Sequence, residues 1–178
     1  MITAHLPAGY VLTTALRRRW PEVPLWVGLV ASVFPDVDLL YFYLVDHRRT
    51  PHHHYWTHLP LPWLALTACT LVGLRVASRR QWEGFAVVFF ANVLLHHILD
   101  TIVGRIPWVA PFSWHDSYLF TIPVRHAFWL WNFVLHWSFG FELVVWVVAL
   151  VVWQRNRKVS GRTIWTGRSA DEESGQAA

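Results

Sequence analysis

Residues 84–103 read GFAVVFFANVLLHHILDTIV, and this apolar stretch decides the fold. A helix needs about 18 to 20 residues to cross a bilayer, at about 1.5 Å per residue, so the stretch is long enough to span one. Its ionisable residues, His96, His97 and Asp100, all lie near its end. The stretch therefore predicts a membrane helix that carries polar chemistry at one end.

Similar apolar runs lie at about 24–45, 60–77 and 126–153, and a shorter, mildly apolar stretch covers residues 3–16. Together they predict an all-α integral membrane bundle of four to five helices, with a short first helix and a second helix broken at Pro35. After Trp153 the chain becomes polar, and such a composition buries too little apolar surface to offset its ordering entropy. We expect a membrane-embedded domain over residues 1–154 and a disordered tail over residues 155–178.

The composition supports a membrane protein. Of 178 residues, 54% are apolar and 15% are charged, against about 25% charged in soluble domains. The net charge of +4 invites a nucleic-acid interpretation, but 11 of the 15 basic residues lie in three blocks beside apolar runs, at 17–19, 75–80 and 155–168. Such blocks are topology signals. We therefore expect the lipid bilayer as partner and no nucleic acid, and the oligomeric state stays open.

The basic blocks also predict the orientation. Counting crossings puts all three blocks on one side and the loops 46–58 and 104–125, with four arginines, on the other. The positive-inside rule makes the side with more basic residues cytoplasmic. We therefore expect a multi-pass protein of the cell (inner) membrane, with a cytoplasmic tail and with the two loops on the non-cytoplasmic side.

Four carboxylates stand inside the apolar runs: Asp36, Asp38, Asp100 and Glu142. Each charge costs about 2.5 to 3.5 kcal/mol on insertion scales, so each needs a reason. The first three have similar predicted depth in the outer half, near the histidine-rich loop. A helix break at Pro35 would let Asp36 and Asp38 both point inward; the alternative is a kink with one solvated carboxylate.

Imidazoles gather on the same side. His96 and Asp100 are four residues apart, so they share one face of a helix and can hold one ion. The alternative is that the pair only stabilises the packing of helices, as buried His–Asp pairs commonly do. The loop from Asp46 to His58 has imidazole or carboxylate at six positions, and the expected topology brings His5 to the same side. Cys69 is the single cysteine, which excludes a site built from several thiolates.

Five short motifs occur in a fixed order: Thr3-Ala4-His5, Pro35-Asp36-Val37-Asp38, His53 to His58, His96 to Asp100, and Pro111-Phe112-Ser113. This order resembles the YdjM-like family of membrane-bound metal-dependent hydrolases, over most of the chain up to about Ser113. The third motif departs from the family, since His54-Tyr55 stands where Arg-Gly is usual and Leu59 replaces a serine. A rival register, His47 to His52, keeps the arginine but has Pro51 in place of the threonine.

The resemblance implies a set of metal ligands and catalytic residues. The implied ligands are His5, Asp36, His53, His58, His96 and Asp100, with Asp38 as a further ligand or a base. Asp38 and Thr57 are the implied catalytic residues. An imidazole and carboxylate set suits Zn²⁺, with Mn²⁺ or Fe²⁺ as alternatives, and more than four ligands indicates two or more ions.

The expected function is hydrolysis of a phosphoester, in a lipid or lipid-linked substrate, by metal-activated water. The main alternative is a membrane protein that binds haem or transports a metal without hydrolysis, with His96, His97, His126 or His136 as ligands. A third interpretation is a scaffold in which the polar residues only join helices.

Overall fold

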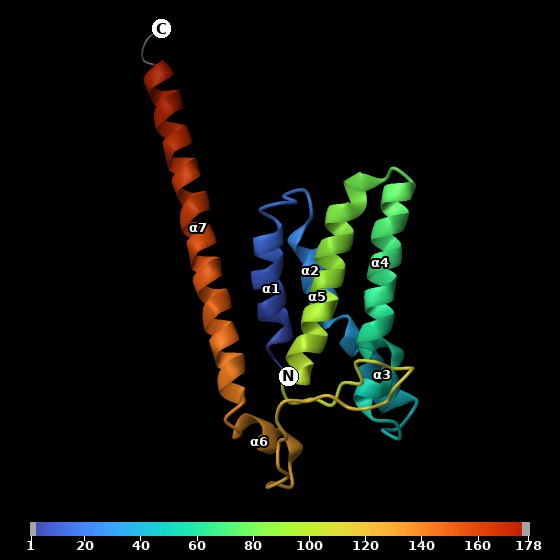
Figure 1. Ribbon diagram of the computed structural model, residues 1–178. Helices are drawn as coiled ribbons and strands as arrows, with labels where there is room; N and C mark the ends of the chain where they lie inside the picture. Colours follow the sequence, from blue (N-terminus) through green and yellow to red (C-terminus); the bar gives the residue numbers. More distant parts are fainter. Residues whose placement is uncertain (1–2, 176–178) are drawn as a thin grey trace.

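The computed structural model describes residues 3–175, with side chains described for residues 3–158 (Figure 1). The helices are α1 (His5–Leu16), α2 (Leu25–Val33), α3 (Asp38–Leu44), α4 (Pro60–Val76), α5 (Glu83–Thr101), α6 (Trp129–Val134) and α7 (Phe139–Gly175). Short 3₁₀ turns lie at Pro35–Val37 (η1), His52–His54 (η2), Trp56–His58 (η3) and Arg80–Trp82 (η4). The all-α class predicted from the sequence is confirmed.

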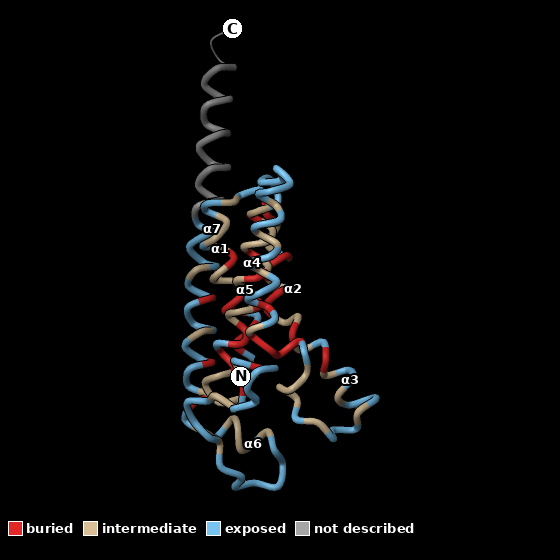
Figure 2. Tube along the Cα trace, turned by 45° about the vertical axis from the view of Figure 1, so that its right-hand side comes forward, coloured by how far each residue is buried: buried red, intermediate tan, exposed pale blue. Residues whose placement is uncertain are grey.

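Helix α5 is the centre of the bundle. It packs against α1, α2 and α4, and α7 packs along the outer side of α1 (Figure 1). A long segment follows α5, passes below the helices in this view and leads into α6, with an isolated antiparallel bridge between Ile106 and Ser117. Buried residues gather where α1, α2 and α5 meet, as the red segments in Figure 2 show.

Helices α1, α2 and α5 approach closely through what we call the neutral layer, formed by Thr13, Gly28 and Asn92. A Cβ atom on Gly28 would lie 1.8 Å from Thr13 Oγ1, so only glycine fits there. The amide of Asn92 donates to Thr13 Oγ1 (3.1 Å) and to the carbonyl oxygen of Val88 (2.8 Å). Small residues and interhelical hydrogen bonds of this kind join helices in membranes.

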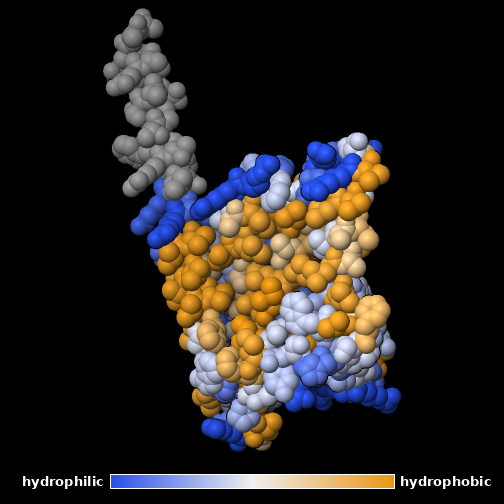
Figure 3. Space-filling view, in the orientation of Figure 1, coloured by the Kyte–Doolittle hydropathy of each residue, from blue (hydrophilic) through white to orange (hydrophobic). Residues whose placement is uncertain are grey.

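The outer surface matches a membrane setting. Large apolar side chains of α7, among them Leu143 and Val147, are exposed, and a broad apolar band lies between hydrophilic ends in Figure 3. Two helical stretches are long and apolar enough to cross a membrane, Arg80–Thr101 and Phe139–Lys158. The bent pair Leu25–Val33 and Pro35–Leu44 makes a third if it counts as one span.

The expected count of four to five spans is not confirmed. Helix α1 has 12 residues and α4 has 17, which at about 1.5 Å per residue reach about 18 and 26 Å, short of a hydrocarbon core of about 30 Å. The described helices thus support two spans, or three with the bent pair. The prediction of a short first helix is confirmed.

The predicted break at Pro35 is also confirmed. Helix α2 ends at Val33, η1 begins at Pro35, and α3 leaves at 53° to α2. Proline has no N–H to donate and disfavours helix at the residue before it, which explains the position of the break. The turn brings the segment with Asp36 and Asp38 to the end of α5.

The fourth apolar run, expected over about 126–153, forms two helices rather than one. Helix α6 ends at Val134 and α7 begins at Phe139. Helix α7 continues to Gly175, and the side chains of the predicted disordered tail lie outside the described residues from 159 onward. The division into a domain over 1–154 and a tail over 155–178 stays a prediction.

Candidate metal centre

Helix α5 supplies two groups of the site from one face. His96 and Asp100 are one turn apart, and Nε2 of His96 lies 3.1 Å from Oδ2 of Asp100. The Nδ1–H of His96 donates to the carbonyl oxygen of Ser32 at 2.9 Å, because a carbonyl can only accept. In the neutral imidazole this leaves Nε2 as the lone-pair nitrogen, and Nε2 faces Asp100.

The first residue of α1 lies on the same face. Nε2 of His5 is 3.1 Å from Oδ1 of Asp100, and its ring stacks on that of His96 with centroids 3.9 Å apart. His5 and His96 are both almost completely buried. Residues 91 positions apart in sequence thus present imidazole nitrogens to opposite oxygens of one carboxylate.

The turns η1, η2 and η3 complete the group. Nε2 of His58 lies 3.3 Å from Nε2 of His96 and 3.6 Å from Oδ1 of Asp36. Nε2 of His53 is 3.6 Å from Oδ2 of Asp100. We call the six residues that converge here the polar cluster: His5, Asp36, His53, His58, His96 and Asp100.

The spacing within the polar cluster suits a bound cation. Ligand atoms about 2.0 to 2.2 Å from a tetrahedral ion lie about 3.3 to 3.6 Å from one another, and the separations given above run from 3.1 to 3.6 Å. Three groups of donor atoms each fall within 4.8 Å: His5, Asp36 and His96; His58, His96 and Asp100; and His52, His53 and His58. The donors can therefore hold one ion or two.

Asp38 and Thr57 lie behind the cluster. Oδ2 of Asp38 accepts from Nδ1 of His58 (2.6 Å) and from the hydroxyl of Thr57, while Oδ1 is 2.8 Å from Nε2 of His52. With both oxygens engaged, Asp38 orients His58 so that Nε2 faces inward. The arrangement fits a carboxylate that supports a metal-binding histidine, and the ligand or base role expected for Asp38 stays a prediction.

The carboxylates set the protonation of the loop histidines. Burial alone would lower the pKa of His58, but the nearby carboxylates of Asp36 and Asp38 outweigh burial and raise the pKa to about 9. Burial lowers the pKa of His53 to about 3. Without a cation, His58 therefore carries a proton at neutral pH whereas His53 is neutral.

Two histidines next to the site lie outside the ligand set that the family resemblance implies. His52 binds Asp38, and His97 is fully buried, with Nδ1 2.6 Å from the carbonyl oxygen of Val93 and Nε2 3.2 Å from that of Thr57. His97 thus joins α5 to η3, the turn that carries His58. In the sequence His97 is a candidate ligand only for the haem or metal-transport alternative, and nothing in its position along the helix indicates the contact with η3.

Other histidines and the fourth membrane carboxylate lie elsewhere. Nε2 of His54 is 3.0 Å from Oδ1 of Asp116. Glu142 is buried on α7 and accepts from the backbone N–H of Thr3 (2.6 Å) and from the Thr3 hydroxyl (2.5 Å). Glu142 therefore ties α7 to the segment just before His5 without joining the polar cluster.

A pocket of about 380 Å³ reaches the polar cluster from the side of α3 and α6. Its lining includes three residues of the polar cluster, Asp36, His53 and Asp100. A molecule in the pocket therefore contacts the cluster directly. A second pocket, of about 520 Å³, touches Asp38 and Thr57 but none of the six cluster residues. Access to the cluster is thus separate from access to Asp38.

The family model described as YdjM inner membrane protein matches residues 1–165, which include the whole polar cluster. No curated protein and no solved structure matches the chain.

Proposed function

The chain belongs to the YdjM inner membrane protein family, and we propose that it is a membrane-bound, metal-dependent hydrolase that cleaves a phosphoester. The observation that carries this proposal is the convergence of four imidazoles and two carboxylates on one point, at spacings that fit a divalent ion. Polar residues that only join helices, as in the neutral layer, do not need this many acceptor atoms. The proposed substrate is a lipid or lipid-linked phosphoester, because the site lies at the end of a membrane helix.

The donor chemistry favours Zn²⁺, with Mn²⁺ as the alternative, since the cluster offers nitrogen and oxygen atoms but no thiolate. Cys69, the single cysteine, is exposed on α4. Two of the donor groups share His58 and two share His96, so a pair of ions is compatible with the set. When bound, such ions would supply a water of lowered pKa and neutralise charge on the phosphoryl oxygens.

The protein's own groups have three tasks in this proposal. Ser32 and Asp38 hold the rings of His96 and His58 with Nε2 directed inward. Asp36 and His53 border the pocket, where they meet the phosphoester. In hydrolysis the water oxygen bonds to phosphorus, the phosphorus–oxygen bond to the alcohol breaks, and the alcohol oxygen receives a proton.

The decisive experiment compares His53→Ala with His54→Ala. Both replace a histidine of η2, but only His53 lies near Asp100, whereas His54 lies near Asp116. Purified wild-type protein should contain stoichiometric metal by mass spectrometry and cleave at least one member of a phosphodiester and phospholipid panel. His53→Ala should lose metal and activity, and His54→Ala should keep both.

Stoichiometric metal without cleavage of any phosphoester, amide or glycoside would replace the hydrolase proposal with metal transport or sensing. A Soret band in the purified protein would replace it with haem binding.

We also propose that the polar cluster faces the non-cytoplasmic side. The support is the excess of basic residues at the opposite end, in the blocks at 17–19, 75–80 and 155–168. Single cysteines introduced at the exposed positions Ser78 and Ser113 on a Cys69→Ala background should react oppositely with an impermeant maleimide in intact cells. Labelling of both positions from outside would refute this orientation.

A further inference from the structure

The pocket beside the polar cluster has two kinds of wall. The acidic and histidine side chains that line the pocket all belong to the candidate metal centre: Asp36, His52, His53 and Asp100. The rest of the lining is apolar or aromatic apart from the Tyr43 hydroxyl and the Trp129 indole N–H: Leu39, Phe42, Tyr43, Val103, Gly104, Ile122, Trp129 and Phe133. A molecule that fills the pocket therefore meets charged groups at the cluster and hydrocarbon elsewhere.

The charge balance of the lining excludes several substrate classes. No lysine or arginine is among the described residues that line the pocket, so imidazoles are the cationic groups that these described residues could offer to a second phosphate. Outside the cluster, the described lining offers few polar side-chain groups, namely the Tyr43 hydroxyl, the Trp129 indole N–H and the His52 imidazole, whereas a sugar or nucleoside next to the phosphoester would bury many polar groups. Unpaired buried polar groups cost about 1 to 3 kcal/mol each, which disfavours both classes.

Helix α6 provides the aromatic wall. Trp129 and Phe133 are four apart and so lie on one face of the helix, and both line the pocket. Trp131, two positions on, is not among the residues that line the pocket, although Trp129 and Trp131 are similarly exposed, at 59% and 52%. This short helix therefore covers one side of the pocket with a defined face.

We propose that the α3–α6 pocket binds a hydrocarbon chain attached directly to the phosphoester, so that the substrate is the phosphate ester of a long-chain alcohol. This inference rests on the proposed function, since the polar cluster fixes where the phosphoryl group lies. The chain would run from the cluster along Leu39 and Phe42 of α3 and along Trp129 and Phe133 of α6.

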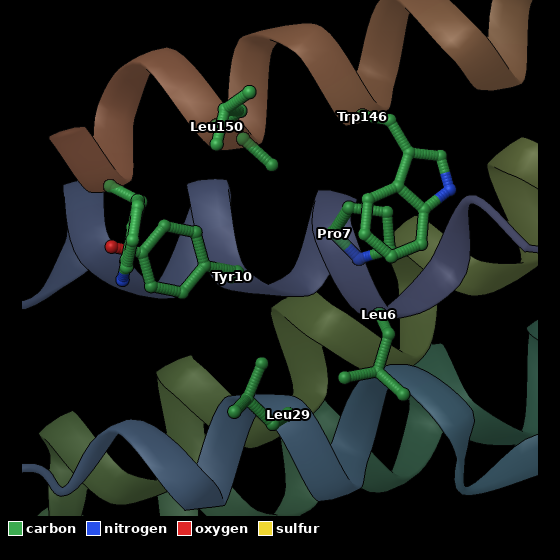
Figure 4. A pocket seen from close by; sticks show the side chains of 8 residues that line it. Leu6, Pro7, Tyr10, Leu29, Trp146 and Leu150 are labelled. Carbon is green, nitrogen blue, oxygen red and sulfur yellow. The ribbon is translucent and has the colours of Figure 1, made fainter.

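A competing location for a lipid chain lies on the far side of α1. There, an apolar groove of about 290 Å³ runs between α1, α2 and α7 (Figure 4). Leu6, Tyr10, Leu29 and Trp146 are among its lining residues, and no member of the polar cluster is. A chain in this groove has no contact with the donor atoms, so the groove fits a bilayer lipid better than a substrate.

Binding of soluble alkylphosphonates tests the proposal without relying on turnover. They carry a phosphoryl group on a carbon chain and have no ester bond to cleave. Calorimetry on metal-loaded protein with methyl-, butyl- and octylphosphonate should give an affinity that rises with chain length, by up to about fourfold for each buried methylene. Trp129→Ala should weaken octylphosphonate at least about tenfold and leave methylphosphonate within about twofold.

Two matched variants make the result specific. Trp131→Ala removes a tryptophan from the same helix outside the pocket, and Trp146→Ala removes one from the α1–α7 groove; both should keep the wild-type chain-length dependence. The proposal is wrong if affinity is independent of chain length, or if Trp146→Ala rather than Trp129→Ala flattens the dependence. Metal-dependent, chain-dependent binding by a protein that hydrolyses nothing would support the pocket and reject only the hydrolase.

Discussion

Helix α5 carries two buried polar regions that differ in kind. In the neutral layer, Asn92 meets Thr13 across the helix interface, and the group is small, uncharged and closed by glycine packing. About one turn further along, His96 and Asp100 meet His5 and the loop histidines. Both regions join the same helices, so joining helices does not explain the charge of the second.

The difference lies in the supply of acceptor atoms. In the neutral layer the amide nitrogen of Asn92 donates to the Thr13 hydroxyl and to the Val88 carbonyl oxygen, at a modest gain typical of membrane hydrogen bonds, about 0.6 kcal/mol on average. In the polar cluster, imidazole nitrogens face one another, as in the 3.3 Å approach of His58 to His96. Under the proposed function a cation would replace the proton that His58 carries between these rings, which predicts that mutations in the two regions have separable effects on metal content and on folding.

The largest effect on the metal site is expected for Asp100→Asn. Asp100 faces His5, His53, His58 and His96, so loss of its charge should reduce metal content and lower activity by more than about 100-fold. Mass spectrometry and substrate turnover measure both. The helical circular dichroism signal should stay within the range of wild type, since apolar packing sets the helices. If the variant unfolds instead of losing metal, the role of the polar cluster is to hold the helices together.

A smaller effect is expected for Asp38→Asn, because Asp38 orients His58 from behind. Support residues of this kind change metal affinity by about 10- to 100-fold. Chelator competition should show that loss, and turnover should recover at saturating metal. Asp46→Asn is the matched control, because Asp46 binds the N–H of Thr50 outside the cluster. Full metal content with lost turnover would instead assign Asp38 as the catalytic base.

The pH dependence of metal affinity should be, for each pH unit, at the lower end of that range. The pKa of His58 is raised to about 9 by Asp36 and Asp38, so this ring must release a proton before it can bind a cation. Affinity should therefore increase as the pH rises from about 6.5 to 8.5, by about tenfold per unit for this one proton. His53, whose pKa is lowered to about 3 by burial, contributes no proton in this range. Flat competition titrations between these pH values would contradict the assignment of His58.

The smallest effect on the metal site is expected for Gly28→Ala. The new Cβ would lie 1.8 Å from Thr13 Oγ1, and overpacking of this kind destabilises by about 1 to 3 kcal/mol. Thermal unfolding in detergent should shift to lower temperature, while metal per folded molecule stays as in wild type. Gly73→Ala on α4, where a Cβ meets no atom within 4 Å, should leave both unchanged. If Gly28→Ala removed the metal from folded protein, the two regions would not be separable.

The local features of the site could be predicted from the sequence. The four-residue spacing of His96 and Asp100 gives a shared helix face, and Pro35 gives the break that turns Asp36 and Asp38 inward. The preferred register of the loop also agrees with the geometry, since His53 and His58 approach Asp100. These predictions rest on helix period and proline chemistry, which act within a few residues.

The sequence by itself determined an all-helical membrane chain, the break at Pro35 and the residue types of a metal site. Tertiary packing alone decided that His5 lies against Asp100, that Asp38 contacts His58 on the side away from Asp100, and that His97 contacts η3. It also set α1 and α4 too short for the expected span count. The physical reason is range: backbone and helix rules fix neighbours in sequence, whereas the close approach of α1, α2 and α5 through Gly28 fixes which distant side chains meet.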